Sequence, residues 1–212
     1  GDSVTWTQTY DTANAGTGKT LTPAGTVSDG NAGADYAVTY ATVTTGAITP
    51  KTLTATVTTQ NRAYDGTTDG TITGCTLSGV IGTEDVTCVT SGATATFDTK
   101  HIGTAKSVTI AGLTTGGSAT LANYTLASGA SSSANITTRA ITVTATTGSK
   151  AYDGTTSSAG TPTITTGSLA SGDSVTWTQT YDTANAGTGK TLTPAGTVSD
   201  GNAGADYAVT YA

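Results

Sequence analysis

Two cysteines are the residues of this chain whose type and spacing most directly suggest chemistry. Cys75 and Cys88 flank a predicted turn between Leu77 and Asp85, so they would face each other if their strands form a hairpin. In an exported protein a disulfide is the favoured interpretation, and closing so short a loop would add about 3 kcal/mol of stability. The alternative, a reactive or metal-binding pair, lacks neighbouring His or Cys residues. We therefore expect a structural disulfide.

Oxygen-bearing side chains form a second pattern, which loosely resembles a calcium-binding loop. The pattern occurs twice, as Asp29, Asn31 and Asp35 and as Asp200, Asn202 and Asp206. The bidentate Glu that closes an EF-hand loop is absent from both copies. Calcium is the one cofactor that the sequence suggests, and we expect no other.

The hexapeptide Ala-Tyr-Asp-Gly-Thr-Thr is a third candidate, and it occurs twice without change. Its central residues are Tyr64, Asp65 and Gly66 in one copy and Tyr152, Asp153 and Gly154 in the other. Paired carboxylates can carry out acid–base chemistry. An Asp-Gly step more simply forms a turn, in which Gly supplies a positive φ and the carboxylate accepts hydrogen bonds from backbone amides. We predict the turn.

The single histidine argues against catalysis. His101 is matched by Asn14 and Asn185 when the corresponding loops are aligned. A Ser/His/Asp or Cys/His arrangement therefore cannot recur in each repeat. We expect that the protein is not an enzyme.

The elements that must position these residues are organised as long repeats. The 41 residues from Gly1 and the 41 residues from Gly172 are identical. An aromatic-Asp pair followed by Gly-Thr-x-Lys begins at Tyr10, Phe97 and Tyr181. We divide the chain into a partial repeat (1–47), a complete repeat (48–135) and a nearly complete second repeat (136–212). Segments of this size can fold as small domains, so we expect beads on a string, taken from a longer array.

Within each repeat, apolar residues alternate with threonines, which is the period-2 pattern of strands with one buried face. No helical spacing is sustained. The predicted fold class is therefore all-β, with tandem small antiparallel β-sandwich domains that are Ig-like or β-grasp-like. The predicted strands are Ser3 to Tyr10, Lys19 to Thr26, Asp35 to Ala41, Leu53 to Thr58, Thr71 to Leu77, Asp85 to Val89, Ala93 to Phe97, Lys106 to Ala111 and Tyr124 to Ala127, with the same order repeated from Ile141. Connections are predicted at Val43 to Pro50 and at Asn135 to Arg139.

Large side chains for a core are scarce, because only 6% of the residues are aromatic. Aromatic residues dominate small cores, so we expect them to be buried and not to form a sugar-stacking platform. The residues predicted for the core are Trp6, Tyr36, Tyr64, Tyr124, Tyr152, Trp177 and Tyr207.

The charge balance excludes a nucleic-acid-binding surface. The net charge is −6 and 10% of the residues are charged, whereas nucleic acid requires clustered Lys and Arg. No apolar run approaches the ~20 residues of a membrane span, so we expect no membrane insertion in this segment. Gly1 opens no signal peptide, and we expect any export signal to lie outside this segment.

The hexapeptide and the aromatic-Asp stretches recur in a fixed order with an Asp-Tyr or Asn-Tyr pair, which lies at Tyr36, Tyr124 and Tyr207. This ordered set closely resembles the YDG-type repeats of large bacterial surface and secreted adhesins, including filamentous-haemagglutinin-like proteins. The resemblance covers essentially the whole chain and implies an exported β-rich repeat on the bacterial cell surface, placed in tandem between an anchor and a functional tip. It supplies no catalytic residues, and the cysteine pair departs from it.

These features favour a structural function, as the stalk or fibre of an extracellular adhesin that projects or links a functional tip. Its partners would be neighbouring repeats of the same chain. One alternative is a module that binds a host or matrix glycan or a host protein. Another is a self-assembling fibre subunit, in which strands from another copy of the chain complete the partial repeat.

Overall fold

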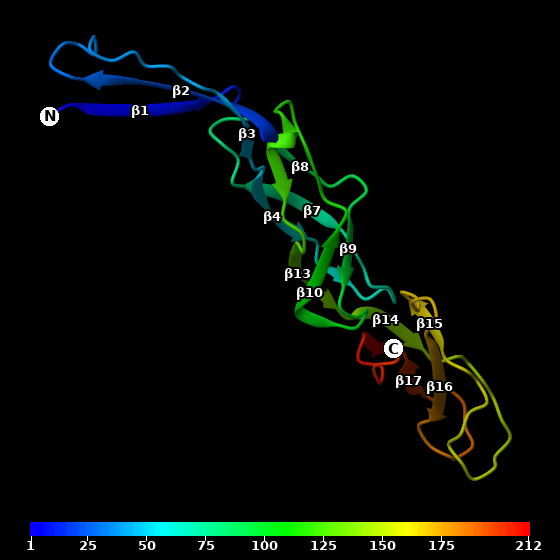
Figure 1. Ribbon diagram of the computed structural model, residues 1–212. Helices are drawn as coiled ribbons and strands as arrows, with labels where there is room; N and C mark the ends of the chain where they lie inside the picture. Colours follow the sequence, from blue (N-terminus) through cyan, green and yellow to red (C-terminus); the bar gives the residue numbers. More distant parts are fainter. The chain divides into compact units, whose positions relative to one another are not determined.

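A computed structural model describes all 212 residues of the chain. It consists of strands and turns with one short 3-10 helix, η1 (Leu121–Asn123), and no α-helix (Figure 1). No helix has the length and apolarity that a membrane span requires. The prediction of an all-β fold is confirmed.

The chain divides into two compact units. Unit 1 comprises Gly1–Thr56, Cys75–Ser91 and Leu113–Ala130, and unit 2 comprises Val57–Gly74, Gly92–Gly112 and Ser131–Ala212.

These units do not coincide with the sequence repeats. The complete repeat (48–135) contributes residues to both units, and the strands β4 (Lys51–Thr59) and β7 (Ile72–Ser78) each have residues in both. The repeat boundaries, with a partial repeat at 1–47 and a second repeat at 136–212, stay a prediction from the sequence.

Unit 1 contains an antiparallel sheet in the order β1-β2-β3. Its strands are β1 (Ser3–Tyr10), β2 (Gly16–Ser28) and β3 (Val43–Ile48). All eight residues of β1 pair with the second part of β2, and the first part of β2 pairs with β3.

Two smaller sheets complete unit 1. The strands β8 (Thr87–Val89) and β11 (Thr114–Gly116) form an antiparallel pair. The strand β12 (Tyr124–Leu126) lies parallel to β4, in a sheet of order β12-β4-β7.

Unit 2 contains a five-stranded sheet in the order β5-β13-β10-β9-β6. These strands are β5 (Arg62–Ala63), β6 (Asp69–Gly70), β9 (Thr94–Phe97), β10 (Gly103–Ala111) and β13 (Ser131–Thr137).

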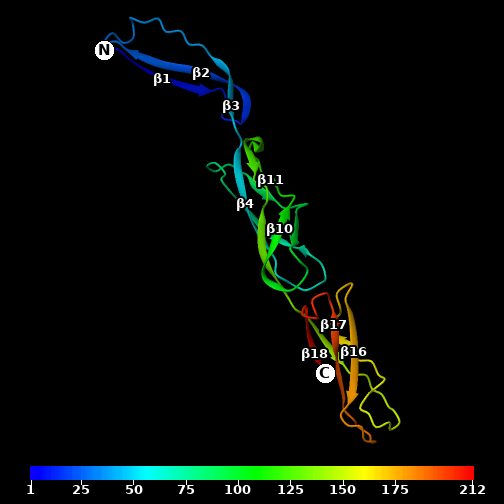
Figure 2. The ribbon, with the colours of Figure 1, turned by 60° about the horizontal axis from the view of Figure 1, so that its bottom comes forward.

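Two further sheets of unit 2 belong to the second repeat. Figure 2 shows their strands β16 (Ser174–Tyr181), β17 (Leu192–Ser199) and β18 (Tyr207–Tyr211). The strand β14 (Arg139–Thr144) lies between β18 and β15 (Thr163–Thr166), and β16 pairs with β17.

The alternating pattern of the sequence explains which side chains form the core. In β9, Ala95 and Phe97 are buried while Thr94 and Thr96 are exposed, because successive side chains of a strand point to opposite faces. Threonine suits the wet face, since its branched Cβ packs on a pleated surface while its hydroxyl stays hydrated.

Three strand pairs are parallel, which the predicted antiparallel sandwich did not include. They are β4 with β12, β5 with β13, and β14 with β18. A period-2 pattern indicates a buried face and carries no information on the direction of the partner strand.

The two segments predicted as connections between repeats are largely paired strands. Val43–Ile48 is β3, and the second connection falls on β13 and β14. The residues between repeats therefore belong to the sheets and are not free linkers.

The strand predicted at Asp35 to Ala41 is absent, although the identical residues Tyr207–Tyr211 form β18. The difference has a clear cause. The strand β14 pairs with β18, and no strand pairs with Tyr36 to Tyr40.

The core prediction for the aromatic residues is correct in part. Tyr64, Tyr124 and Tyr207 are buried and Trp177 is half-buried. Trp6, Tyr36 and Tyr152 are exposed, so for these three the prediction is wrong.

Candidate junction site between two repeats

The tyrosine of the first hexapeptide lies where the complete repeat meets the second repeat, within unit 2. Tyr64 follows β5, and its backbone N–H donates to the carbonyl of Thr137 at the end of β13, at 2.9 Å. Its side chain is 0% exposed. Groups of both repeats contact it, among them Lys100 of the complete repeat and Asp173 and Tyr207 of the second repeat.

A carboxylate of the second repeat holds two tyrosine hydroxyls. The Tyr64 hydroxyl donates to Asp173 Oδ1 at 3.3 Å, and the Tyr207 hydroxyl donates to Asp173 Oδ2 at 2.7 Å. The two rings pack edge to face with their centroids 5.6 Å apart, a favoured aromatic geometry. Tyr207 also accepts a hydrogen bond of 2.7 Å from the Ala170 amide. Asp173 therefore links residues from both repeats.

A cation completes the charge balance of this cluster. Lys100 Nζ lies 3.7 Å from Asp173 Oδ1 and 5.8 Å from the centroid of the Tyr64 ring. Burial raises the pKa of Tyr207 to about 12 and also raises the pKa of Tyr64. Both hydroxyls thus remain protonated donors at neutral pH.

A second polar pair, His101 and Asp206, lies beside the cluster around Asp173. His101 Nδ1 lies 2.7 Å from Asp206 Oδ2, and the Ile102 amide donates to Asp206 Oδ1 at 2.9 Å. Asp206 is fully buried. Buried carboxylates need such partners, because an unpaired charge in the interior is costly.

Asp206 is positioned by the loop that the sequence offered as a calcium site. Asp200 Oδ1 accepts the amides of Asn202 and Gly204, and its Oδ2 accepts the amide of Asp206, at distances of 2.7 to 3.0 Å. Burial raises the pKa of Asp200, but these three amides outweigh it and lower the pKa overall. The Asn202 side chain donates to Asp206 at 2.9 Å.

The identical loop in the partial repeat has the same internal bonds. Asp29 accepts the amides of Asn31, Gly33 and Asp35 at 2.8, 2.7 and 3.1 Å. These bonds, the Gly33 amide first, lower the pKa of Asp29. In both copies the carboxylates close a loop, and the structure contains no group of three His, Cys, Asp or Glu side chains that could hold a metal ion. The calcium site stays a prediction without geometric support.

Arg139, the first residue of β14, donates hydrogen bonds to residues of both repeats. Its backbone amide donates to the Asp206 carbonyl at 2.9 Å, and its Nε donates to the Ser168 carbonyl at 2.6 Å. Its Nη1 donates to the Tyr64 carbonyl at 3.3 Å.

Unit 1 contains a related junction between the partial repeat and the complete repeat. The Ala15 amide donates to Asn123 Oδ1 at 2.7 Å, and Asn123 Nδ2 donates to Asn14 Oδ1 at 3.0 Å. Asn14 corresponds to His101, and Asn123 corresponds to Asp206. The same geometry therefore uses a neutral amide pair in one junction and a His–Asp pair in the other.

The hexapeptides form turns of one kind. Asp65 accepts the amide and the hydroxyl of Thr67, both at 2.9 Å, and Asp153 accepts the same two groups of Thr155, again at 2.9 Å. Gly66 and Gly154 have φ of 84° and 76°, where glycine is favoured. A basic residue pairs with each carboxylate, Arg62 with Asp65 and Lys150 with Asp153. Lys150 and the Thr155 donors lower the pKa of Asp153 to about 2.

Only the first turn is covered by another repeat. A Cβ placed on Gly66 would lie 3.2 Å from the Ala170 Cβ, so glycine also allows close approach of the second repeat. Tyr152, the counterpart of Tyr64, is 70% exposed.

The cysteines form a disulfide in unit 1 and leave no free thiol. Cys75 lies in β7 and Cys88 in β8, which belong to different sheets. The bridge therefore joins two sheets and does not lie across one hairpin.

Sequence reasoning missed Asp173, Lys100 and Arg139 as junction residues. The sequence does contain a signal for one pair. The junction pair Asn14 and Asn123 has His101 and Asp206 as its counterparts, so both positions of the pair change together. The cluster can fix two repeats against each other.

Comparison with known proteins gives one positive finding. A family described as YDG domain matches residues 49–133 and 137–212. No curated protein and no solved structure matches the chain.

Proposed function

Because the chain belongs to the YDG domain family, which matches most of its length, we propose that it is a structural repeat region of a large bacterial extracellular adhesin. In this role the repeats form a stalk or fibre that projects or links a functional tip. Their partners are neighbouring repeats of the same chain.

One observation carries the proposal: the fully buried Tyr64 side chain of one repeat contacts Asp173 and Tyr207 of the next repeat. Its hydroxyl shares Asp173 with Tyr207, and β13 leads into β14 with a single residue between them. A ligand-binding domain needs no such interlock with its neighbour, whereas a stalk depends on it, because freely jointed domains would not hold a tip at a distance.

The test places the chain between a bacterial surface anchor and an epitope, in one, two and four tandem copies. We expect the height of the epitope above the cell envelope, measured by super-resolution microscopy, to rise with copy number. The matched control is the same series with Tyr64→Ala. A height that does not depend on copy number would contradict the proposal.

A second candidate function, glycan or host-protein binding, is favoured by one feature. Trp6 packs edge to face on Tyr40, and the identical pair Trp177–Tyr211 has the same geometry, with centroids 6.1 and 6.2 Å apart. Trp6, Tyr40 and Tyr211 are exposed. Aromatic faces in water suit sugar stacking. Binding of the wild type and of Trp177→Ala to a glycan panel tests this second function. Saturable binding that the folded variant loses would support glycan binding, and the absence of binding by the wild type would dismiss it.

A further inference from the structure

The first strand of the complete repeat pairs in parallel with a strand near the end of the same repeat. In unit 1 the strand β4 pairs with β12, with Lys51 opposite Tyr124 and Leu53 opposite Leu126. The Ala127 amide extends this pairing by donating to the Leu53 carbonyl at 2.8 Å. The chain enters β4 from β3 and continues from β12 into β13, so tension along the chain acts on this pair.

The second repeat, in unit 2, contains a longer pair of the same kind. The residues of β14 from Arg139 to Val143 lie opposite β18 in parallel register. The Arg139 amide donates to the Asp206 carbonyl at 2.9 Å, and the Ala212 amide donates to the Val143 carbonyl at 3.0 Å. Hydrogen bonds therefore join the two strands at both ends of the pair.

The direction of the partner strand decides how tension loads these hydrogen bonds. The chain enters β14 at Arg139 and leaves β18 at Tyr211, and these residues lie at opposite ends of the parallel pair. Tension applied there pulls the strands past each other along their axes, so it loads all the bonds between them together. In the antiparallel pair β16–β17, Ser174 lies opposite Ser199, so tension on these two ends breaks one bond at a time.

We propose that the parallel pairs β4–β12 and β14–β18 are mechanical clamps, through which the repeats bear tension along the chain. Forced unfolding is governed by the unfolding rate, and bonds that must break together slow it. A spacer needs only length, so bearing tension goes beyond the proposed stalk function. The inference rests on the strand pairing and does not depend on that function.

Buried side chains oppose sliding in both clamps. Leu53 in β4 and Val143 in β14 are 0% exposed, and Ile141 in β14 is also buried. Because side chains alternate between the two faces of a strand, a slip by one residue would move these apolar groups to the wet face. Sliding therefore exposes core surface as well as breaking hydrogen bonds.

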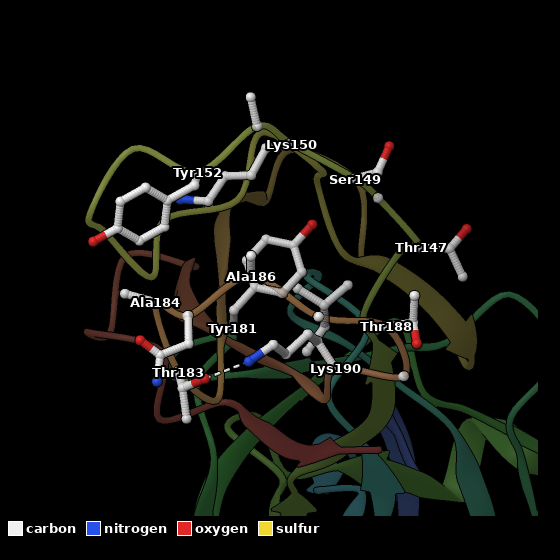
Figure 3. A pocket seen from close by; sticks show the side chains of 16 residues that line it. Thr147, Ser149, Lys150, Tyr152, Tyr181, Thr183, Ala184, Ala186, Thr188 and Lys190 are labelled. Atoms are coloured by element: carbon white, nitrogen blue, oxygen red, sulfur yellow. Dashed lines mark hydrogen bonds between the residues drawn. The ribbon is translucent and has the colours of Figure 1, made fainter.

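The open part of the second repeat lies outside its clamp. A pocket of about 430 Å³ lies between the segments 147–152 and 181–192, and Figure 3 shows Tyr181 and Lys190 among its lining residues. No lining residue belongs to β14 or β18. The pocket thus leaves the pairing of the two clamp strands intact.

The test pulls the full chain with optical tweezers in two directions. Handles are attached through azide-bearing residues at exposed positions, which leaves the disulfide intact. Handles at Thr138 and Ala212 load the β14–β18 pair along its axis, whereas handles at Thr138 and Ala205 pull on the adjacent starts of the two strands. At one loading rate, we expect a rupture force several-fold higher for the first pair of handles.

Equal rupture forces in the two directions, or a lower force for Thr138 and Ala212, would overturn the proposal. Such a result would leave the stalk function standing if the height of the epitope still rises with copy number. The two proposals can therefore fail separately.

A matched pair of proline variants locates the resistance. The backbone of Asp206 and that of Ala212 bond to β14, so the amide of Thr210 faces β14 as well, because the bonding direction alternates along a strand. The Val209 amide faces the other side, where β18 is the edge of its sheet and proline is tolerated. Thr210→Pro should lower the rupture force between Thr138 and Ala212 more than Val209→Pro does. An equal fall in both variants would overturn the assignment of the clamp to this pair.

Discussion

At the scale of single residues, the two hexapeptide tyrosines give a controlled comparison within one chain. Tyr64→Ala removes a fully buried ring and should lower the free energy of unfolding by about 3–5 kcal/mol. Tyr152→Ala changes a side chain that is 70% exposed and should have an effect within about 0.5 kcal/mol. Urea denaturation of both variants measures the difference. Equal losses would mean that the junction does not bury Tyr64 in solution.

The buried carboxylate at the junction gives a second comparison, with Asp35 as its exposed twin. Asp206→Ala leaves the Ile102 amide and the Asn202 side chain without their acceptor, so we expect a loss of about 1–3 kcal/mol in the free energy of unfolding. Asp35→Ala should lower the free energy of unfolding by clearly less than Asp206→Ala does.

A double variant tests whether a neutral amide pair can replace the His101–Asp206 pair. The change of His101 and Asp206 to Asn copies the amide pair Asn14–Asn123. It should recover part of the stability that Asp206→Ala loses, measured in the same denaturation series. No recovery would show that the two junctions are not equivalent.

The Tyr207 hydroxyl predicts a dependence on alkaline pH. Its pKa is raised to about 12 from the ordinary value of 10.0, so the unfolded chain loses this proton first as the pH rises. The stabilising contribution is complete below about pH 10 and is lost as the pH rises toward 12. Thermal unfolding at a series of pH values should show this fall, and Tyr207→Phe should make it shallower. If Tyr207→Phe loses stability with rising pH as steeply as the wild type, groups other than Tyr207 cause the pH dependence.

The two hexapeptides show which parts of the site the sequence could predict. The turns at Asp65 and Asp153 follow from local Asp-Gly chemistry, so the sequence alone indicates them. The burial of Tyr64 does not, since Tyr152 has the same six residues around it and is exposed. Its environment depends on another repeat, which no local pattern encodes.

At the scale of elements, the disulfide joins two sheets of unit 1, between β7 and β8. Its two cysteines are 13 residues apart, and closing a loop of this size is expected to contribute about 3 kcal/mol. Reduction should therefore lower the denaturation midpoint of the wild type. A Cys75→Ala/Cys88→Ala variant should match the reduced protein and not respond to reductant. A wild type that is indifferent to reductant would contradict a stabilising bridge.

The strands show where a period-2 pattern succeeds and where it fails. The expected strand Ser3 to Tyr10 is β1, because apolar and threonine residues alternate strictly. β13 was missed because it opens with three serines, and only Ala134 and Ile136 are buried in it. β18 and its twin at Tyr36 to Tyr40 share one sequence, and the pairing with β14 alone makes one of them a strand.

At the scale of the whole molecule, the main feature of the chain is the way its repeats are joined. The compact units divide the complete repeat, and strands run through the segments predicted as connections between repeats. Tandem domains with small interfaces normally move relative to each other. A junction that buries Tyr64, Asp173 and Asp206 should instead hold the repeats on either side in one arrangement.

The most direct measurement is single-molecule energy transfer across that junction, with dyes on two exposed residues of unit 2, Thr109 in β10 and Thr178 in β16. The account predicts one narrow distribution for the wild type and a broad one for Tyr64→Ala, with Tyr152→Ala like the wild type. A broad distribution for the wild type, or a narrow one for Tyr64→Ala, would contradict the claim that this junction fixes one repeat against the next.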